Sequence, residues 1–419
     1  MQKLFVLAAC LLAVSFATPD NHWVVLVAGS KGYGNYRHQA DVCHAYQIAR
    51  GQGIPESQII TFAYDDIANS ASNPFPGKVF NQPNGKDVYA SCKIDYRGSD
   101  VNPKKFLQVI KGEGSGKVLK STSADKVFMY FADHGAPGLI AFPSGHLYAD
   151  DLNSALKEMH SKNMYERLVF YIEACESGSM FENLLDSNIN VYGVTAANAK
   201  ESSWGYYCYP DDVVNGVHLR SCLGDEFSIN FLEDSDNHAV CAESLHEQFS
   251  NVKAKTKKSH VMEYGDLSFK TGEAVGQYQG VCDSLEWSFF GHSREEKDRH
   301  DSFAVDSREA NLHYLYADYL LTNDVSALTK LQDEIAMREE IELTFMSLAQ
   351  KFPVSSEIIY PKTESEWNCY KEASIKYSET CEEHDHALDK FGQIMNMCTE
   401  GKDMWTKDDI KQAIIYACI

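Results

Sequence analysis

Short apolar runs alternate with polar, helix-like stretches from His22 to about Gly280. Five of these runs are rich in β-branched and aromatic residues, at positions 24–28, 59–63, 127–131, 168–172 and 191–194. Strands that are apolar at consecutive positions are buried on both faces, which is typical of parallel sheets covered by helices. Between the third and fourth runs, apolar side chains recur with helical spacing at Leu152, Ala155, Leu156 and Met159. The pattern therefore predicts an α/β domain with a mostly parallel sheet flanked by helices.

The hydrophobic pattern changes in the C-terminal third of the chain. Residues 283–323 lose the strand signal and become polar and charged, which predicts a linker or activation peptide. Beyond this stretch, apolar residues such as Leu328 and Leu331 recur at helical spacing. We therefore predict that the α/β domain spans 18–282 and that a small helical domain spans 324–419.

The N-terminus has the order of a secretory signal peptide. Lys3 precedes an apolar run from Leu4 to Phe16, and small residues lie near its end. A buried helix is the alternative, but the extreme N-terminal position and the lysine favour a signal peptide over residues 1–17. No later stretch approaches a membrane-spanning length. We expect a soluble protein of the secretory pathway, with no membrane partner.

The charge balance excludes some partners. Sixty acidic residues against 38 basic ones give a net charge of -22. This balance argues against nucleic acid and anionic membranes as binding partners, since both attract basic surfaces.

The cysteine count points to at least one free thiol. Of the 12 cysteines, Cys10 lies in the predicted signal peptide, which leaves an odd number for an oxidising compartment. None of the spacings forms a CxxC pair, so we expect no metal site. The four C-terminal cysteines predict two disulfides whose pairing the spacing leaves open: Cys369, Cys381, Cys398 and Cys418.

Two neighbouring strands of the predicted sheet end on reactive side chains. The third apolar run leads into His134 and Gly135, and the fourth leads into Cys175. A right-handed crossover brings the ends of both strands to the same edge of the sheet. A thiol nucleophile needs a proton-transfer partner within reach, and the amides of Gly135 and Cys175 could stabilise an oxyanion. Either residue alone is more often structural, but together they favour a cysteine nucleophile with a histidine base.

These blocks carry a family resemblance over almost the whole chain. The motif of an apolar block with His-Gly, a spacer, and an apolar block with Ala-Cys is shared by caspase-like cysteine peptidases. The chain resembles the legumain family of asparaginyl endopeptidases in stretches that include HWVVLVAGS, NYRHQADVCHAY, NPFPGKVFNQPNGKDVY, FADHG, FYIEACESGSMF, NVYGVTAAN, ESSWG and SHVMEYG. The resemblance implies a caspase-like fold and an endopeptidase without a cofactor that acts on proteins and peptides.

The resemblance also implies roles for individual residues. Cys175 and His134 would form the catalytic dyad, and Asn35 would orient the imidazole. The pocket for the residue before the scissile bond, the S1 pocket, would be formed by Arg37, His38, Glu173, Ser203 and Asp225. Without the resemblance, an ordinary ion pair between Arg37 and Asp225 and a turn role for Asn35 would be the preferred interpretations.

The implied pocket chemistry suits asparagine. A carboxamide has one acceptor and two donors, which match a cation such as Arg37 and carboxylates such as Glu173 and Asp225. Aspartate would be admitted only when acid protonates the substrate or the pocket. The sequence thus favours cleavage after asparagine, with some cleavage after aspartate at low pH.

The last domain resembles a death-domain-like prodomain that covers the active site of a precursor and acts as an intramolecular inhibitor. The resemblance implies disulfides between Cys369 and Cys398 and between Cys381 and Cys418. Asn323, at the end of the linker, is a hypothetical self-cleavage site for acid-triggered activation. A lysosomal or vacuolar location follows from the resemblance, although secretion remains open.

A loop between Cys208 and Cys222 looks longer than in animal relatives and is similar to the plant type. We expect these two cysteines to form a disulfide that closes the loop. Plant relatives with such loops can ligate peptides, which suggests ligation as a secondary activity. Two alternatives remain: a catalytically silent binding protein, and the catalytic subunit of a GPI transamidase, which would leave the C-terminal cysteines unexplained.

Overall fold

The computed structural model describes residues 22–282, 302–381 and 384–418. The predicted signal peptide and the first part of the predicted linker lie outside the described residues. No helix in the described ranges is long and apolar enough to cross a membrane.

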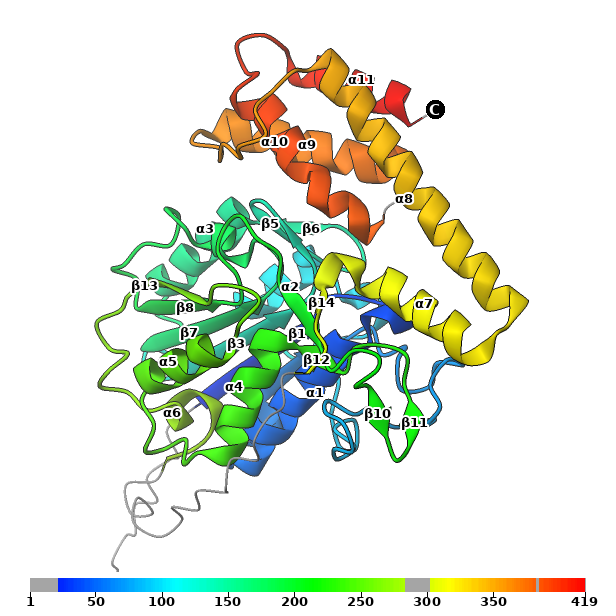
Figure 1. Ribbon diagram of the computed structural model, residues 1–419. Helices are drawn as coiled ribbons and strands as arrows, with labels where there is room; N and C mark the ends of the chain where they lie inside the picture. The colour runs from blue at the N-terminus through cyan, green and yellow to red at the C-terminus, as the bar shows by residue number, and fades with distance from the viewer. Residues whose placement is uncertain (1–21, 283–301, 382–383, 419) are drawn as a thin grey trace, which may run out of the picture.

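A six-stranded sheet forms the centre of the N-terminal domain (Figure 1). Its strand order is β13-β8-β7-β3-β1-β2, and all neighbours are parallel except the edge strand β13. The strands are β1 (His22–Ala28), β2 (Ile59–Phe62), β3 (Lys126–Ala132), β7 (Arg167–Glu173), β8 (Val191–Thr195) and β13 (Met262–Gly265). The five predicted apolar runs are therefore confirmed as strands. The half-exposed β13 was not predicted, because it lacks a continuous apolar run.

Helices cover both faces of this sheet. Alternate residues of each strand point to opposite faces, and each face is buried in its own apolar cluster. Contacts with the strands and within these clusters place α1, α4, α5 and α6 on one side and α2 and α3 on the other. Their bounds are α1 (Tyr36–Gly51), α2 (Pro103–Ile110), α3 (Ala149–Ser161), α4 (Glu226–Asn237), α5 (Leu245–Lys255) and α6 (Gly276–Gln279). The predicted mostly parallel sheet flanked by helices is confirmed.

Short strands and 3₁₀ turns lie outside the central sheet, several of them at the edge where its parallel strands end. One small sheet contains β4 (Gly135–Ala136), β5 (Leu139–Ala141) and β6 (His146–Tyr148). A second contains β12 (Gly224–Asp225), β9 (Trp204–Tyr206) and β14 (Val305–Asp306), and β10 (Val213–Val214) pairs with β11 (Val217–His218). The 3₁₀ turns are η1 (Tyr33–Asn35), η2 (Glu56–Gln58), η3 (Gly98–Asp100), η4 (Ser177–Met180), η5 (Ser307–Glu309) and η6 (Asp385–Lys390).

The C-terminal part is helical, as predicted. Its helices are α8 (Val325–Lys351), α9 (Glu364–Thr380), α10 (Phe391–Thr399) and α11 (Lys407–Ala417). Capping boxes fix the start of α9, at Thr363 and Glu366, and of α11, at Thr406 and Asp409. We call residues 325–418 the cap. The stretch expected to be a linker contains a further helix, α7 (Ala310–Thr322), which packs against α8.

Five disulfides link cysteines within the described residues. In the cap, Cys369 pairs with Cys398 and Cys381 pairs with Cys418, the pairing that the resemblance implies. In the N-terminal domain, Cys208 pairs with Cys222, which closes the loop as expected. Two pairs that the sequence left open are Cys43 with Cys92 and Cys241 with Cys282.

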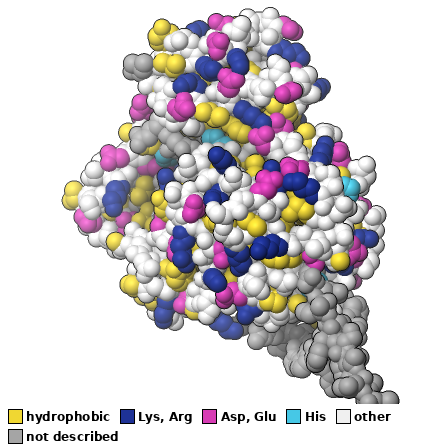
Figure 2. All heavy atoms as spheres, turned by 180° about the vertical axis from the view of Figure 1, so that it is seen from behind, with side chains coloured by type: hydrophobic (Ala, Val, Ile, Leu, Met, Phe, Trp, Pro, Cys, Tyr) yellow, Lys and Arg dark blue, Asp and Glu magenta, His cyan; other side chains and the backbone are white. Residues whose placement is uncertain are grey.

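The cap lies over the small β4–β6 sheet (Figure 1). A side-chain atom at Gly138 would lie 2.9 Å from Met395 and 3.0 Å from Trp367, so bare backbone meets apolar cap side chains there. The Tyr370 hydroxyl donates to the carbonyl of Pro137 at 2.8 Å. Seen from behind, acidic and basic side chains are interspersed over both parts (Figure 2). Apolar contact and individual polar pairs therefore join two parts of the same net sign.

Candidate active site

The register of β3 and β7 brings the two reactive residues together. Ala132 lies opposite Glu173, and the next amide, that of Asp133, donates to the Glu173 carbonyl at 3.1 Å. His134 and Cys175 each follow their strand by two residues, so they leave the sheet at the same point. A Cβ atom at Gly135 would lie 2.2 Å from the Cys175 carbonyl oxygen, which shows how closely the two strand ends approach.

Cys175 is a completely buried thiol. It is the free cysteine among the described residues, and its Sγ accepts from the Ser203 amide at 3.3 Å. Burial raises the pKa of the Cys175 thiol to about 11, although the positive charge of Arg308 acts in the opposite direction. In this form of the protein the nucleophile is therefore held as the neutral, unreactive thiol.

His134 is oriented by Asn35. Its Nε2 lies 2.8 Å from Asn35 Oδ1, and Asn35 comes from the turn that begins α1. An amide oxygen accepts only, so Nε2 carries the proton and Nδ1 keeps the lone pair. His134 Nδ1 is buried and has no hydrogen-bond partner in the described structure. Nδ1 is thus the atom available to take the thiol proton.

The predicted pocket residues gather beside the dyad, all of them buried. Arg37 Nε donates to Asp225 Oδ1 at 2.8 Å, and both side chains have no exposed surface. His38 Nε2 lies 3.5 Å from Asp225 Oδ2. Ser203 Oγ lies 3.7 Å from the Cys175 sulfur, which connects the pocket to the nucleophile. The structure therefore places Arg37, His38, Ser203 and Asp225 in one site.

The buried carboxyl groups of the pocket hold protons more readily than usual. Burial raises the pKa of Glu173 and of Asp225, and their mutual repulsion raises that of Glu173 further. Glu173 Oε2 accepts from the amide and hydroxyl of Ser228, each at 2.9 Å, while Glu173 Oε1 and Asp225 Oδ2 lack a hydrogen-bond partner. Two buried acceptors beside a guanidinium are available for a polar ligand. Asp41, a third buried carboxyl that accepts from the Asp225 amide, was not predicted.

Comparison with known proteins identifies the family. Residues 22–281 match the model of the peptidase C13 family. The chain belongs to the peptidase C13 family. It is 41% identical to hemoglobinase of Schistosoma mansoni over 98% of this chain and 96% of that protein, and 41% identical to legumain of Mus musculus over 99% and 97%. It is 39% identical to the vacuolar-processing enzyme of Vicia sativa over 90% of this chain and 82% of that protein.

These relatives make the protein a cysteine endopeptidase of the C13 family, which acts on proteins and peptides. Among solved structures, caspase-1 from Spodoptera frugiperda is a distant likeness, with a TM-score of 0.36 and 11% identity over 64% of this chain and 93% of that one.

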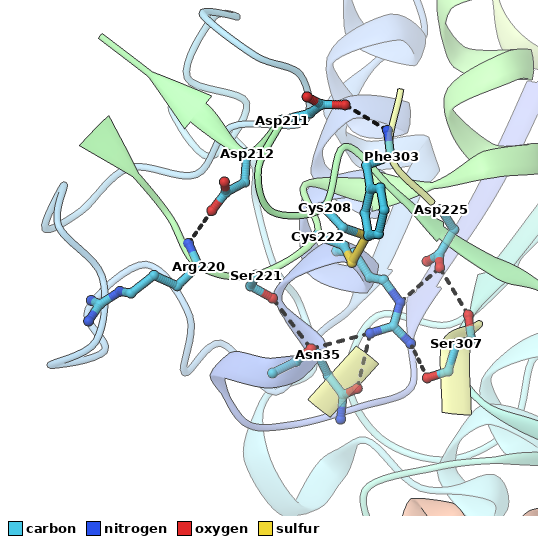
Figure 3. Close-up of a disulfide and its surroundings, with 12 residues drawn as sticks. Asn35, Cys208, Asp211, Asp212, Arg220, Ser221, Cys222, Asp225, Phe303 and Ser307 are labelled. Carbon is cyan, nitrogen blue, oxygen red and sulfur yellow. Dashed lines mark hydrogen bonds and ion pairs between the residues drawn. A yellow bond between two sulfur atoms is a disulfide. The ribbon is translucent and has the colours of Figure 1, made fainter. Parts of the chain in front are cut away.

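The peptidase's own chain fills the pocket. β14 pairs with β9, and the Ser307 amide donates to the Ser203 carbonyl at 3.0 Å. Ser307 Oγ lies 3.4 Å from Asp225 Oδ1, and the Ser307 carbonyl oxygen accepts from Arg37 at 3.5 Å (Figure 3). This carbonyl therefore points into the pocket. Ser307 was missed from the sequence, because nothing in a polar linker signals that the strand preceding Ser307 pairs with β9.

Two further charged residues from the C-terminal half reach the dyad. Arg308 forms an ion pair with Glu176, the residue after the nucleophile, and donates to Ser202 at 2.5 Å. Asp385 of the cap lies 3.2 Å from His134 Nε2 and accepts from Asn35 Nδ2 at 3.1 Å. Sequence reasoning missed both, since only the folded chain shows that they lie at the dyad.

Two side-chain sets in the described residues have the spacing for a metal ion. His38, Asp133 and His134 place ligand atoms within 4.8 Å of one another, as do Asp234, His238 and Glu243. The first set belongs to the catalytic site described above. In the second, burial and the neighbouring Asp234 raise the pKa of Glu243 to about 8.

Gly135→Ala tests the contact between the strand ends. The new methyl group would have to displace the Cys175 carbonyl, so we expect loss of peptidase activity and a destabilisation of about 1–3 kcal/mol. Gly51→Ala, at a position with open space around it, is the control and should retain activity and stability. Activity assays and thermal unfolding check both, and a fully active Gly135→Ala enzyme would contradict the geometry.

Proposed function

We propose that this peptidase hydrolyses peptide bonds on the C-terminal side of asparagine, and of aspartate at low pH. The observation that carries the proposal is the buried pocket in which Arg37 donates to Asp225 while one carboxyl oxygen each of Glu173 and Asp225 lacks a hydrogen-bond partner. A carboxamide would accept from the guanidinium and donate to the carboxylates. The family relatives named legumain and vacuolar-processing enzyme support the same activity.

The pocket also explains the proposed role of acid in cleavage after aspartate. A charged aspartate would meet two carboxylates in a buried site, which is unfavourable at neutral pH. Because the pKa values of Glu173 and Asp225 are raised, falling pH neutralises the pocket before it neutralises an ordinary carboxyl. The carboxyl side chain of the substrate then meets donors in place of charges.

In the proposed reaction, His134 Nδ1 takes the thiol proton as Cys175 attacks the carbonyl carbon. The amides of Gly135 and Cys175 stabilise the oxyanion, and the imidazolium returns the proton to the leaving amine. Water then hydrolyses the thioester. An incoming amine in place of water would give peptide ligation, which we propose as a side activity.

A peptide series tests the specificity. Acid-activated enzyme should cleave peptides with Asn before the scissile bond. At neutral pH it should cleave the Gln, Asp and Arg counterparts at least about 10²-fold more slowly, because a side chain that does not match the pocket leaves buried polar groups of the pocket without partners. The Asp peptide alone should gain on the Asn peptide as the pH falls. Cys175→Ala is the control. Equal cleavage after Arg and Asn would refute the pocket argument.

We infer that the C-terminal part inhibits the precursor. β14 occupies the edge of β9, and Asp385 contacts both His134 and Asn35. A substrate strand therefore has to displace this segment of the chain. By analogy with the vacuolar-processing relative, we propose a secretory route to a lysosome or vacuole, with secretion as the alternative.

Asn323 remains our proposed activation site. It is exposed at the turn between α7 and α8, which projects away from the sheet (Figure 1). Because the turn extends away from the edge that carries Cys175, we propose that a second enzyme molecule cleaves it.

Activation kinetics test this proposal. The rate of maturation at acid pH should rise with protein concentration, and Asn323→Ala should block the cleavage that releases a cap beginning at Asp324. Sequencing of the released cap measures the site. A concentration-independent rate, or an unchanged cap N-terminus in Asn323→Ala, would sink the idea.

His386 is positioned to make cap release depend on acid. It lies in η6 beside Asp385, and its Nε2 is 3.5 Å from Glu342. Burial and the charge of Arg338 lower the pKa of His386, against the opposite effects of Glu309 and Asp389, while Lys390 lowers it further. Apart from Glu309 these charged groups belong to the cap, so the folded cap favours neutral His386. The contribution of His386 to the stability of the cap is present above the ordinary histidine pKa, near 6.5, and is lost as the pH falls below it.

Replacement of His386 tests this contribution. His386→Gln cannot take up a proton, so its activation should change less between pH 7 and pH 5 than that of the parent chain. His313→Gln is the control, since that half-buried histidine lies in α7 and outside η6. An unchanged pH profile in His386→Gln would show that other groups govern release.

A further inference from the structure

β14 shows the register that a substrate strand takes on β9. The pair is antiparallel, with Val305 opposite Gly205 and Asp306 opposite Trp204. Ser307 follows with its amide on the Ser203 carbonyl and its side chain in the pocket. If a substrate asparagine replaces Ser307, the residues before it follow the path of residues 302–306. This step rests on the proposed function.

The loop closed by Cys208 and Cys222 extends this path. The Cys208 amide donates to the Phe303 carbonyl at 3.1 Å, and the Phe303 amide donates to Asp211 Oδ2 at 2.6 Å (Figure 3). Both contacts involve main-chain groups of the bound strand. The loop therefore binds the main chain of the residue that lies four positions before the pocket residue, and this binding does not depend on the side chain at that position.

The residues of this bound segment face two environments. Val305 is buried against the disulfide between Cys208 and Cys222. Ser302, Phe303 and Ala304, which precede β14, line a cavity of about 480 Å³. The methyl group of Ala304 is small, so a longer side chain at this position has room to extend into the cavity.

The walls of the cavity carry more positive than negative side chains. Lys255, Lys257 and Lys258 line it, together with the two carboxylates of Asp211 and Glu226. Both carboxylates already accept from backbone amides: Asp211 from Phe303, and Glu226 from the amides of residues 257 and 258, each at 3.0 Å. The chain as a whole has a net charge of -22, so three lysines beside the substrate path form a local positive site that can attract a negatively charged side chain of a substrate.

Lys258 connects the cavity to the strand that binds substrate. Its Nζ lies 5.4 Å from the ring centroid of Trp204, the β9 residue opposite Asp306. An ammonium held over an aromatic face keeps its charge near the path of the bound strand. Lys257 is exposed and donates to the carbonyl of Ala254. Both ammonium groups are thus placed on the rim, where a carboxylate entering the cavity can reach them.

We propose that this cavity, the lysine subsite, binds an acidic side chain at the position three residues before the scissile asparagine. A glutamate in place of Ala304 would fill the open volume and bring its carboxylate to the lysines. The class of preferred substrate is therefore an asparagine peptide with Glu or Asp at this position. Charge pairs on the rim of the cavity are exposed to solvent, so the gain in affinity for an acidic substrate is modest and falls with added salt.

A matched peptide series tests the subsite with the acid-activated full chain. Peptides that differ only in Glu, Gln, Ala or Lys three residues before Asn should give kcat/KM in the order Glu, then Gln and Ala, then Lys. We expect kcat/KM to be about two- to fivefold higher for the Glu peptide, and lower by a similar factor for the Lys peptide, than for the Gln and Ala peptides. The steps should shrink at about 1 M salt.

Charge reversal provides the second arm. Lys257→Glu and Lys258→Glu should each invert the order so that the Lys peptide is preferred over the Glu peptide. Lys253→Glu is the control, since this exposed lysine lies near the end of α5, a few residues before Lys257, and does not line the cavity. The Ala peptide should be cleaved equally by all variants, which shows that they are folded.

The outcomes separate this inference from the proposed function. Cleavage of all Asn peptides at one rate, or an order that the Lys257 and Lys258 variants do not change, would overturn the lysine subsite alone. If peptides were cut after a residue other than Asn, the proposed specificity would fail. The same series built on that residue would then still show or exclude the preference for an acidic side chain.

Discussion

The register between β3 and β7 is the constraint on which the site depends. A shift of one residue would turn every side chain of a strand to the other face and would separate His134 from Cys175. The register is held by seven consecutive residue pairs whose side chains are almost all buried in the two apolar clusters. Gly135 allows the final approach, since any side chain there would meet the Cys175 backbone. Catalytic geometry is thus a consequence of core packing.

The same sheet edge sustains an unusual density of buried charge. Arg37, Asp41, Glu173 and Asp225 are all buried, with a single guanidinium among three carboxyls. Burial of unpaired charge is costly, so the raised pKa values of these carboxyls are the expected response. The side-chain amide of Asn81 donates to Asp41, and the amide and hydroxyl of Ser228 donate to Glu173, which keeps these carboxyl groups in place. The pocket is therefore polar and buried, which suits the proposed recognition of a small carboxamide.

The sequence could predict what local pattern encodes. Continuous apolar runs predicted the parallel strands, and the position of His134 and Cys175 after two of them predicted a shared edge. It could not predict β13, whose residues are half-exposed, or α7, which has polar neighbours on both sides. Ser307, Arg308 and Asp385 were missed for a different reason. They reach the site only through contacts between distant parts of the chain, and no periodicity or composition encodes such contacts.

The contacts of Ser307 connect inhibition with substrate recognition. The resident strand uses β9, the Ser203 carbonyl, Arg37 and the disulfide-closed loop, which are also the groups available to a substrate. A change that strengthens substrate binding at these groups would also strengthen binding of the resident strand. Under the proposed inhibition, release of the precursor therefore depends on the contacts of the cap. The apolar packing around Gly138 and the polar contacts of η6 lie outside the path of the strand. The proposed lysine subsite escapes this coupling, because the resident chain has only the small Ala304 at the position where a substrate would place an acidic side chain.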